Sequence, residues 1–133
     1  MPIAVSQASS ETIGSTPSRR RSGYRPPRVA AAQRAYGSAN LGYKVGTCQA
    51  IPLDDHSVDV VVSFETIEHI VEHELFLAEI RRVLRPGGLL VISTPDKVVY
   101  SPPGSEPNPF HLKELDRAEF FELIRSRFAN VAF

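Results

Sequence analysis

The chain has 133 residues, of which 42% are hydrophobic, 8% aromatic and 23% charged, which is the composition of an ordinary soluble domain with one small core. Fifteen basic residues balance fifteen acidic ones, so the net charge gives no reason to expect nucleic acid or an anionic membrane as the partner. A single cysteine, Cys48, excludes an internal disulfide, and no apolar run approaches the roughly 20 residues of a membrane span, so we expect a cytoplasmic protein.

Residues 1–28 are predicted to form a disordered basic tail. The segment consists mainly of Ser, Thr, Pro, Gly and Arg, so it has little apolar surface to offset the entropy lost on ordering. Through residue 40 six arginines face one acidic residue, Glu11, which gives a local net charge of +5. The run Arg19-Arg20-Arg21 is a candidate contact for an anionic polymer, but a solvated tail is the simpler interpretation.

Residues 29–133 are predicted to form an α/β domain, and its first elements are short. Val29–Tyr36 is alanine-rich and compatible with a helix that stops at Gly37, and Leu41–Val45 follows as a candidate strand. Val58–Ser63 is the strongest strand, because consecutive β-branched residues favour a pleated surface. Its nearly continuous apolar run predicts burial on both faces, at the centre of a parallel sheet.

The second half alternates in the same way. Apolar residues at helical spacing predict a helix over Leu75–Leu84, which Arg85-Pro86-Gly87-Gly88 ends. Leu89–Ser93 is predicted to be a second buried strand, and Thr94–Pro109, with five prolines, a loop.

A final helix is predicted to begin at Asp116, with Glu119 as the capping-box partner of that N-cap. Strands that alternate with helices are typical of a parallel α/β sheet, in which ligands bind beyond the carboxyl ends of the strands. The turns after the predicted strands are therefore the places to look for a site.

Three segments in those positions resemble a known family. Pro52–Val61 (PLDDHSVDVV), Phe64–His69 (FETIEH) and Glu79–Gly88 (EIRRVLRPGG) look like successive landmarks of the class I S-adenosylmethionine-dependent methyltransferases of type 11. The resemblance extends over about residues 29–133. It implies a partial Rossmann-like fold, with a mainly parallel sheet and flanking helices, and S-adenosylmethionine as the cofactor.

The resemblance also implies where that cofactor would lie. The turn after the first strand would touch the adenine, which nominates Thr47 and Cys48. The turn after the Val58 strand would lie near the methionine part, which nominates Ser63, Phe64 and Glu65.

The sequence departs from the family pattern at its beginning. No G-x-G-x-G occurs, and the doublet Gly87-Gly88 follows a helix instead of a strand. An acidic residue for the ribose hydroxyls is missing upstream of Leu41, and Gly46-Thr47-Cys48 replaces the usual Gly-Asp-Ala. We therefore expect the C-terminal portion of a methyltransferase domain, truncated before the cofactor-binding glycine loop.

This loss leaves the Val58 strand at an uncovered edge, because the family's first strand would be its neighbour. An edge with a long apolar run favours association. We expect the chain to pair its Leu41 strand into the vacant place, to self-associate, or to be marginally folded.

Carboxylates and imidazoles near the Val58 strand are candidates for a metal site. Glu65, Glu68 and His69 stand at i, i+3 and i+4, so a helix would place them on one face. Such a set suits Mg²⁺ or another divalent ion. The pattern resembles the metal-binding segment of small-RNA 2′-O-methyltransferases and of ubiquinone-pathway O-methyltransferases, and the resemblance to the former nominates His111 as a further ligand.

Alternatives without a metal stay open. Glutamates in a first helical turn are favoured by the helix dipole alone. His69 or His111 is then a candidate general base toward a hydroxyl. His56 and His73 are predicted to be surface histidines.

Three functions follow as expectations. The first is methyl transfer to an oxygen or nitrogen acceptor. Phe110–Leu115 resembles the tails of methyltransferases encoded among cell-surface polysaccharide genes, which implies a small-molecule or glycan acceptor such as a sugar or glycolipid hydroxyl. The second is a non-catalytic half-domain that acts as an interaction or regulatory module through its exposed sheet edge. The third is a gene remnant behind an altered start, so whether this chain is an active enzyme is left open.

Overall fold

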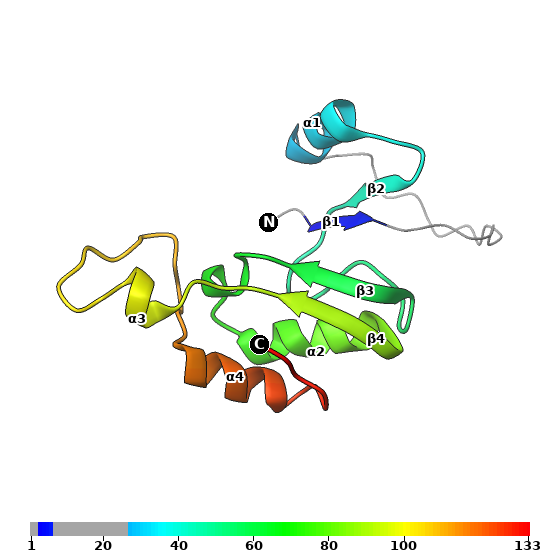
Figure 1. The fold of residues 1–133 in the computed structure, drawn as a ribbon. Helices are drawn as coiled ribbons and strands as arrows, with labels where there is room; N and C mark the ends of the chain where they lie inside the picture. Colours follow the sequence, from blue (N-terminus) through cyan, green and yellow to red (C-terminus); the bar gives the residue numbers. More distant parts are fainter. Residues whose placement is uncertain (1–2, 7–26) are drawn as a thin grey trace. The chain divides into compact units, whose positions relative to one another are not determined.

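The computed structural model describes residues 3–6 and 27–133, and the chain divides into two compact units, residues 1–47 and 48–133, each described here by itself (Figure 1). The first unit contains strand β1 (Ile3–Ser6), helix α1 (Pro27–Tyr36) and strand β2 (Leu41–Lys44). Most of the tail predicted to be disordered lies outside the described residues, but Ile3–Ser6 within it forms a strand.

Strand β2 pairs with β1 and not with the Val58 strand. The two strands are antiparallel, with Ile3 opposite Lys44 and Ser6 opposite Leu41. Along β2, half-buried and exposed residues alternate, which is typical of an antiparallel strand with one covered face. The described strands therefore form two separate two-stranded sheets, and the expected insertion of the Leu41 strand beside the Val58 strand is not observed.

The second unit is built on strand β3 (Val58–Ser63) and strand β4 (Leu84–Ile92), which are parallel as predicted. Their register runs from Val60 opposite Leu89 to Ser63 opposite Ile92, and it is irregular before Val60. The irregularity accommodates the Arg85–Gly88 turn, where Gly87 adopts a φ of 80° that favours glycine. The structure thus counts this turn within β4, whereas the sequence predicted a strand from Leu89.

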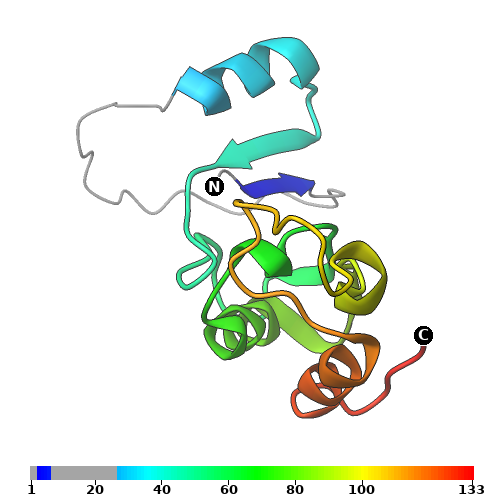
Figure 2. The same cartoon turned by 90° about the vertical axis from the view of Figure 1, so that its left-hand side faces the viewer.

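Helices α2 (His73–Val83) and α4 (Arg117–Arg125) lie on the same side of this sheet, below it in Figures 1 and 2. The apolar side of α2 faces the sheet, and the spacing that predicted this helix is confirmed. The core of the second unit lies between the sheet and these helices. Its most buried apolar side chains are Ile67, Phe76, Leu77, Ile80, Val83, Leu84 and Ile124.

The opposite side of the β3–β4 sheet is exposed. Val60, Val62 and Leu89 are each more than half exposed, and Val91, which pairs with Val62, is 39% exposed. The prediction that the Val58 strand is buried on both faces is therefore wrong, because the helices of this unit cover one face only. Among the described residues β3 has β4 as its one strand neighbour, so within them it is an edge strand, as expected.

One further helix signal is confirmed, and two other helical segments differ from the prediction. The capping box of α4 is present, with the side chain of Asp116 accepting from the Glu119 amide at 2.8 Å and that of Glu119 accepting from the Asp116 amide at 3.0 Å. The turn after β3 is the short 3₁₀ helix η1 (Ile67–His69) and not an α-helix. The proline-rich segment contains a further helix, α3 (Lys97–Tyr100), capped by the side chain of Asp96. None of the described helices is long and apolar enough to cross a bilayer.

Candidate functional site

The carboxyl ends of β3 and β4 are joined just beyond the last ladder positions. The amide of Ser93 donates to the Ser63 carbonyl at 3.0 Å, and the amide of Glu65 donates to the Ser93 carbonyl at 3.2 Å. The Ser93 hydroxyl donates to Oε1 of Glu65 at 2.7 Å. Glu65 has a φ of 47°, which is unfavourable for a residue with a side chain. Ser93 thus holds both the amide and the carboxylate of this strained residue, and backbone strain of this kind is found at functional sites.

Glu68 lies in the middle of this region and is 1% exposed. Its Oε2 accepts a hydrogen bond from the Thr94 hydroxyl at 3.2 Å, while its Oε1 has no hydrogen-bond partner among the described residues. The Glu68 carbonyl accepts from the amides of Leu112 and Lys113 at 2.8 and 3.2 Å. One residue thus connects the turn after β3 with the turn after β4 and with the segment that carries His111.

His69 is fixed through one ring nitrogen. Its Nδ1 lies 2.7 Å from the carbonyl oxygen of Phe110, and a carbonyl can only accept, so we assign the proton to Nδ1. The neutral ring then has its lone pair on Nε2. That atom lies 3.9 Å from Oε1 of Glu68.

His111 has the same arrangement with a different partner. Its Nδ1 lies 2.5 Å from Oε1 of Glu114, and the two side chains are only 7% and 12% exposed. Hydrogen bonds from Ser101 and then from His111 lower the pKa of Glu114, so this carboxylate is ionised and holds the Nδ1 proton. The ring of His111 stacks on Tyr100 with centroids 5.0 Å apart. It meets the ring of His69 edge-on at 5.1 Å.

Three of the four predicted metal ligands come together. Glu68, His69 and His111 each offer a ligand atom, and these atoms all lie within 4.8 Å of one another. We call these three residues the Glu-His cluster. Glu65 is not part of it, because the backbone turns at that residue and its carboxylate binds Ser93 instead. The expectation of a single helical face carrying Glu65, Glu68 and His69 fails for that reason.

Several features of the Glu-His cluster suit a metal ligand set. Metal-binding histidines usually donate their other N–H to a carbonyl or a carboxylate, and both imidazoles do so here. The buried and unpartnered Oε1 of Glu68 supplies an oxygen ligand. The same features suit proton transfer, because a lone pair on Nε2 accepts either a proton or a metal ion.

The residues nominated for the donor have varied surroundings. Thr47 is exposed and ends the first unit, while Cys48 begins the second and is half-buried. Burial raises the pKa of the Cys48 thiol, which therefore stays protonated at neutral pH. Ser63 is buried with its hydroxyl unpartnered among the described residues, whereas Phe64 is 58% exposed.

Three residues that support the cluster had no role assigned from the sequence. Thr94 and Glu114 lie in segments that the sequence singled out, the turn after the Leu89 strand and Phe110–Leu115, whereas no motif pointed to Tyr100. The i,i+3 spacing of His111 and Glu114 is the sequence feature from which their side-chain contact could have been predicted. His73 was predicted to lie on the surface, but it is 3% exposed at the start of α2, and burial lowers its pKa. His56 is exposed, as expected.

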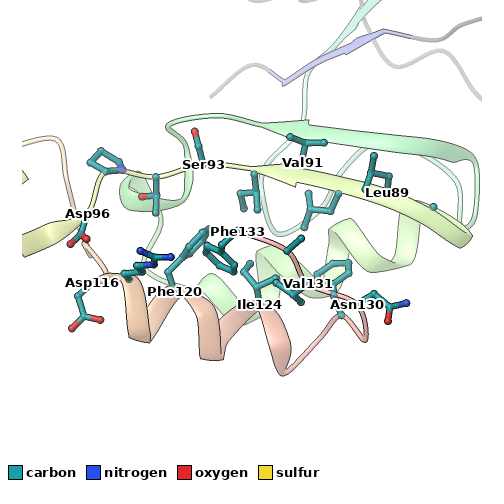
Figure 3. Close-up of a pocket in the computed structure, with 18 residues that line it drawn as sticks. Leu89, Val91, Ser93, Asp96, Asp116, Phe120, Ile124, Asn130, Val131 and Phe133 are labelled. Atoms are coloured by element: carbon teal, nitrogen blue, oxygen red, sulfur yellow. The ribbon is translucent and has the colours of Figure 1, made fainter.

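A cavity of about 660 Å³ lies between β4 and α4 (Figure 3). Figure 3 shows Phe120, Ile124 and Phe133 directed into it from α4 and from the chain end. Ser93 and Thr94 line one end, and Thr94 is the residue that donates to Glu68. The cavity is therefore mainly apolar with a polar end next to the Glu-His cluster.

Comparisons with known proteins agree on one family. The family described as methyltransferase domain matches residues 24–92. A probable S-adenosylmethionine-dependent methyltransferase of Mycolicibacterium smegmatis is 48% identical over 82 residues, which cover 61% of this chain and 32% of the relative. One of Mycobacterium tuberculosis is 48% identical over 84 residues, with 62% and 31% covered. The chain thus spans about a third of the length of these curated relatives.

A more distant relative and two solved structures extend the comparison. A ubiquinone biosynthesis O-methyltransferase of Sinorhizobium fredii is 29% identical over 66 residues, with 50% of this chain and 27% of the relative covered. A structure described as the complex of the Haloferax volcanii Trm112 methyltransferase activator with the putative methyltransferase matches with a TM-score of 0.66 and 29% identity, covering 77% of this chain and 46% of that one. The [4+2]-cyclase SpnF matches with a TM-score of 0.59 at 21% identity, with 74% and 36% covered, which shows the fold alone.

Proposed function

This chain belongs to the class I S-adenosylmethionine-dependent methyltransferases, and from that premise we propose that its second unit forms the acceptor side of a methyl-transfer site. The observation that carries the proposal is the state of the two imidazoles. His69 and His111 both engage Nδ1 and leave a lone pair on Nε2, beside the buried carboxylate of Glu68.

The chemistry that this arrangement supports is proton removal during methyl transfer. When bound, S-adenosylmethionine would supply an electrophilic methyl group to the acceptor oxygen, and its sulfur would keep the electron pair of the broken bond. The acceptor hydroxyl loses its proton to Nε2 of His111, and the ionised Glu114 stabilises the imidazolium through Nδ1. His69 is the second base within the same cluster. The protein otherwise contributes alignment of donor and acceptor.

We propose that the donor meets the residues nominated from the sequence, which are Thr47 and Cys48 at the adenine and Ser63, Phe64 and Glu65 at the methionine part. The unpartnered hydroxyl of Ser63 and the strained backbone of Glu65 support the second group. A glycine-rich loop is absent from these 133 residues, so they supply only part of the proposed donor site. We expect residues 1–133 to bind the donor weakly unless further residues complete the site.

A hydroxyl is the acceptor group that we propose. One relative is named as an O-methyltransferase, and a lone pair on imidazole is suited to remove a hydroxyl proton near neutral pH. The cavity between β4 and α4 supports an acceptor with an apolar portion, because its lining is mainly apolar. Its polar end reaches Thr94, beside the cluster, where the hydroxyl of such an acceptor would lie. A glycolipid has both an apolar portion and a hydroxyl group.

A divalent metal is the second candidate use of the same residues. Glu68, His69 and His111 would hold it through one carboxylate oxygen and two Nε2 atoms. When bound, such an ion supplies Lewis acidity that lowers the pKa of an acceptor hydroxyl. In that case His69 and His111 serve as ligands, and the role of Glu114 is to orient His111.

A non-catalytic module is the alternative from a different class. The exposed β3–β4 face and the unpaired edge of β3 favour association with another sheet or helix. Such a module would keep its fold and its contacts but would not bind the donor.

Calorimetric titration with S-adenosylmethionine, followed by transfer of labelled methyl groups to sugar and glycolipid hydroxyls, distinguishes these functions. We expect wild-type transfer to fall by a factor of about 100 or more in His111→Asn, which removes the base. The exposed His56→Asn is the matched control and should keep wild-type transfer. Absence of both binding and transfer at millimolar donor would contradict the enzyme and leave the module.

A further inference from the structure

The loop between β2 and β3 is fastened to helix α2 by one arginine. Nη1 of Arg82 donates to the carbonyl of Leu53 at 2.9 Å and to Oδ1 of Asp55 at 2.7 Å. Nη2 of the same side chain donates to the carbonyl of Ile51 at 2.9 Å. Three acceptors from five consecutive residues therefore converge on a single guanidinium.

Glu79, one helical turn earlier, completes the arrangement. Nε and Nη2 of Arg82 donate to the two carboxylate oxygens of Glu79, each at 2.8 Å. Oε2 of Glu79 also accepts from the amide of Ile51 at 2.8 Å. All five N–H donors of Arg82 thus have an acceptor. A lysine carries the same charge but lacks this planar fork.

The pair is stable as an ion pair and is partly shielded from water. The side chains of Arg82 and Glu79 are 31% and 19% exposed. Hydrogen bonding to Arg82 lowers the pKa of Glu79, so both groups are charged at neutral pH. Because Ile51 is also buried, the loop is held at its centre by both polar and apolar contacts.

We propose that Arg82 and Glu79 are positioning residues for the donor site, which hold the loop Cys48–Asp55 in the conformation that receives the adenine. Neither side chain contacts the donor in this role; each acts through the backbone of Ile51 and Leu53. The inference rests on the proposed function, since that is what assigns this loop to the adenine. The loop lies wholly within the second unit, so its conformation depends on contacts inside one compact body.

Hydrogen exchange and donor-product binding together test the inference. We would measure amide exchange of the full chain and the binding of S-adenosylhomocysteine for wild type, Arg82→Met and Arg82→Lys. Arg81→Met is the matched control, because Arg81 is an exposed neighbour on the same helix. Arg82→Met should speed exchange across Cys48–Asp55 on the order of tenfold and weaken binding by a similar factor, through loss of charge-assisted hydrogen bonds. Arg82→Lys should lie between it and wild type, and Arg81→Met should match wild type.

Each other result has a distinct meaning. Unchanged exchange in the loop, or equal acceleration throughout β3 and β4, overturns the positioning role, since the first shows no restraint and the second shows a general stabilising contact. If wild type does not bind S-adenosylhomocysteine, the proposed function fails, while loop exchange still decides whether Arg82 restrains the loop. Should Arg82→Met not fold, Glu79→Gln removes the charge of the partner and is expected to give the same local acceleration.

Discussion

His111 and Glu114 form a buried pair in which Nδ1 of the imidazole lies 2.5 Å from Oε1 of the carboxylate. The contact joins two residues of the segment after the proline-rich loop. It also leaves Nε2 of His111 free to face Glu68 and His69. Because the pair is only 7% and 12% exposed, its charge state bears on stability as well as on chemistry.

The first prediction concerns acid. The pKa of Glu114 lies below its ordinary value of 4.5, and a group of this kind stabilises the fold above its ordinary pKa and loses that contribution as the pH falls through its folded pKa. Wild type should therefore lose unfolding free energy below about pH 4.5, and Glu114→Gln should lose less over the same range. Urea denaturation between pH 6 and pH 3 measures both slopes, and parallel slopes would show that Glu114 plays no part.

The second prediction separates backbone strain from hydrogen bonding at Glu65. Glu65→Ala removes the bond to Ser93 and keeps the positive φ, so it should cost about 1 kcal/mol of unfolding free energy. Glu65→Gly removes the same bond but relieves strain of about 1 kcal/mol, so it should be close to neutral. Denaturant unfolding of the two variants checks the difference, which vanishes if the backbone at Glu65 is unstrained.

The third prediction concerns the core of the second unit. Leu77 is fully buried on α2, so Leu77→Ala should cost about 2 to 5 kcal/mol of unfolding free energy. Leu75 is 53% exposed on the same helix, and Leu75→Ala should change stability by less than about 0.5 kcal/mol. Thermal or chemical denaturation of the pair tests which side of α2 faces the sheet, and equal costs would contradict the packing described above.

The fourth prediction concerns the exposed face of the β3–β4 sheet. Val62 is 57% exposed on an edge strand, where a lysine opposes strand addition and apolar association. We expect sedimentation velocity to show self-association of wild type that increases with concentration and is reduced in Val62→Lys. Circular dichroism should confirm an unchanged fold in the variant. A wild type that stays monomeric at every concentration would remove the basis for association through this face.

The sequence allowed the local features to be predicted more fully than the spatial ones. The parallel pairing of β3 with β4, the apolar side of α2 and the capping box at Asp116 follow from residue spacing, which acts over a few positions. The exposure of Val60 was not predictable from an apolar run, because burial depends on which layers are present. A β-branched run looks the same whether one or both faces are covered.

The candidate site was predictable in part for the same reason. His69 and His111 are 42 positions apart, and a family resemblance, not spacing, brought them together in advance. Glu65 does not join Glu68 in the cluster, because its carboxylate accepts a hydrogen bond from Ser93, and the positive φ at this residue was not predictable from residue spacing. The roles of Tyr100 and Thr94 depend on the path of the loop after β4, which prolines restrict but do not specify.

The amides of Leu112 and Lys113 donate to the carbonyl of Glu68, so this residue has a structural role in its backbone and a separate chemical role in its side chain. The path of that segment is held by the main-chain carbonyl of residue 68, which every amino acid supplies, whereas the reactivity of the residue depends on its side chain. A substitution at position 68 would therefore change the chemistry of the cluster while leaving the acceptor of these two backbone hydrogen bonds in place.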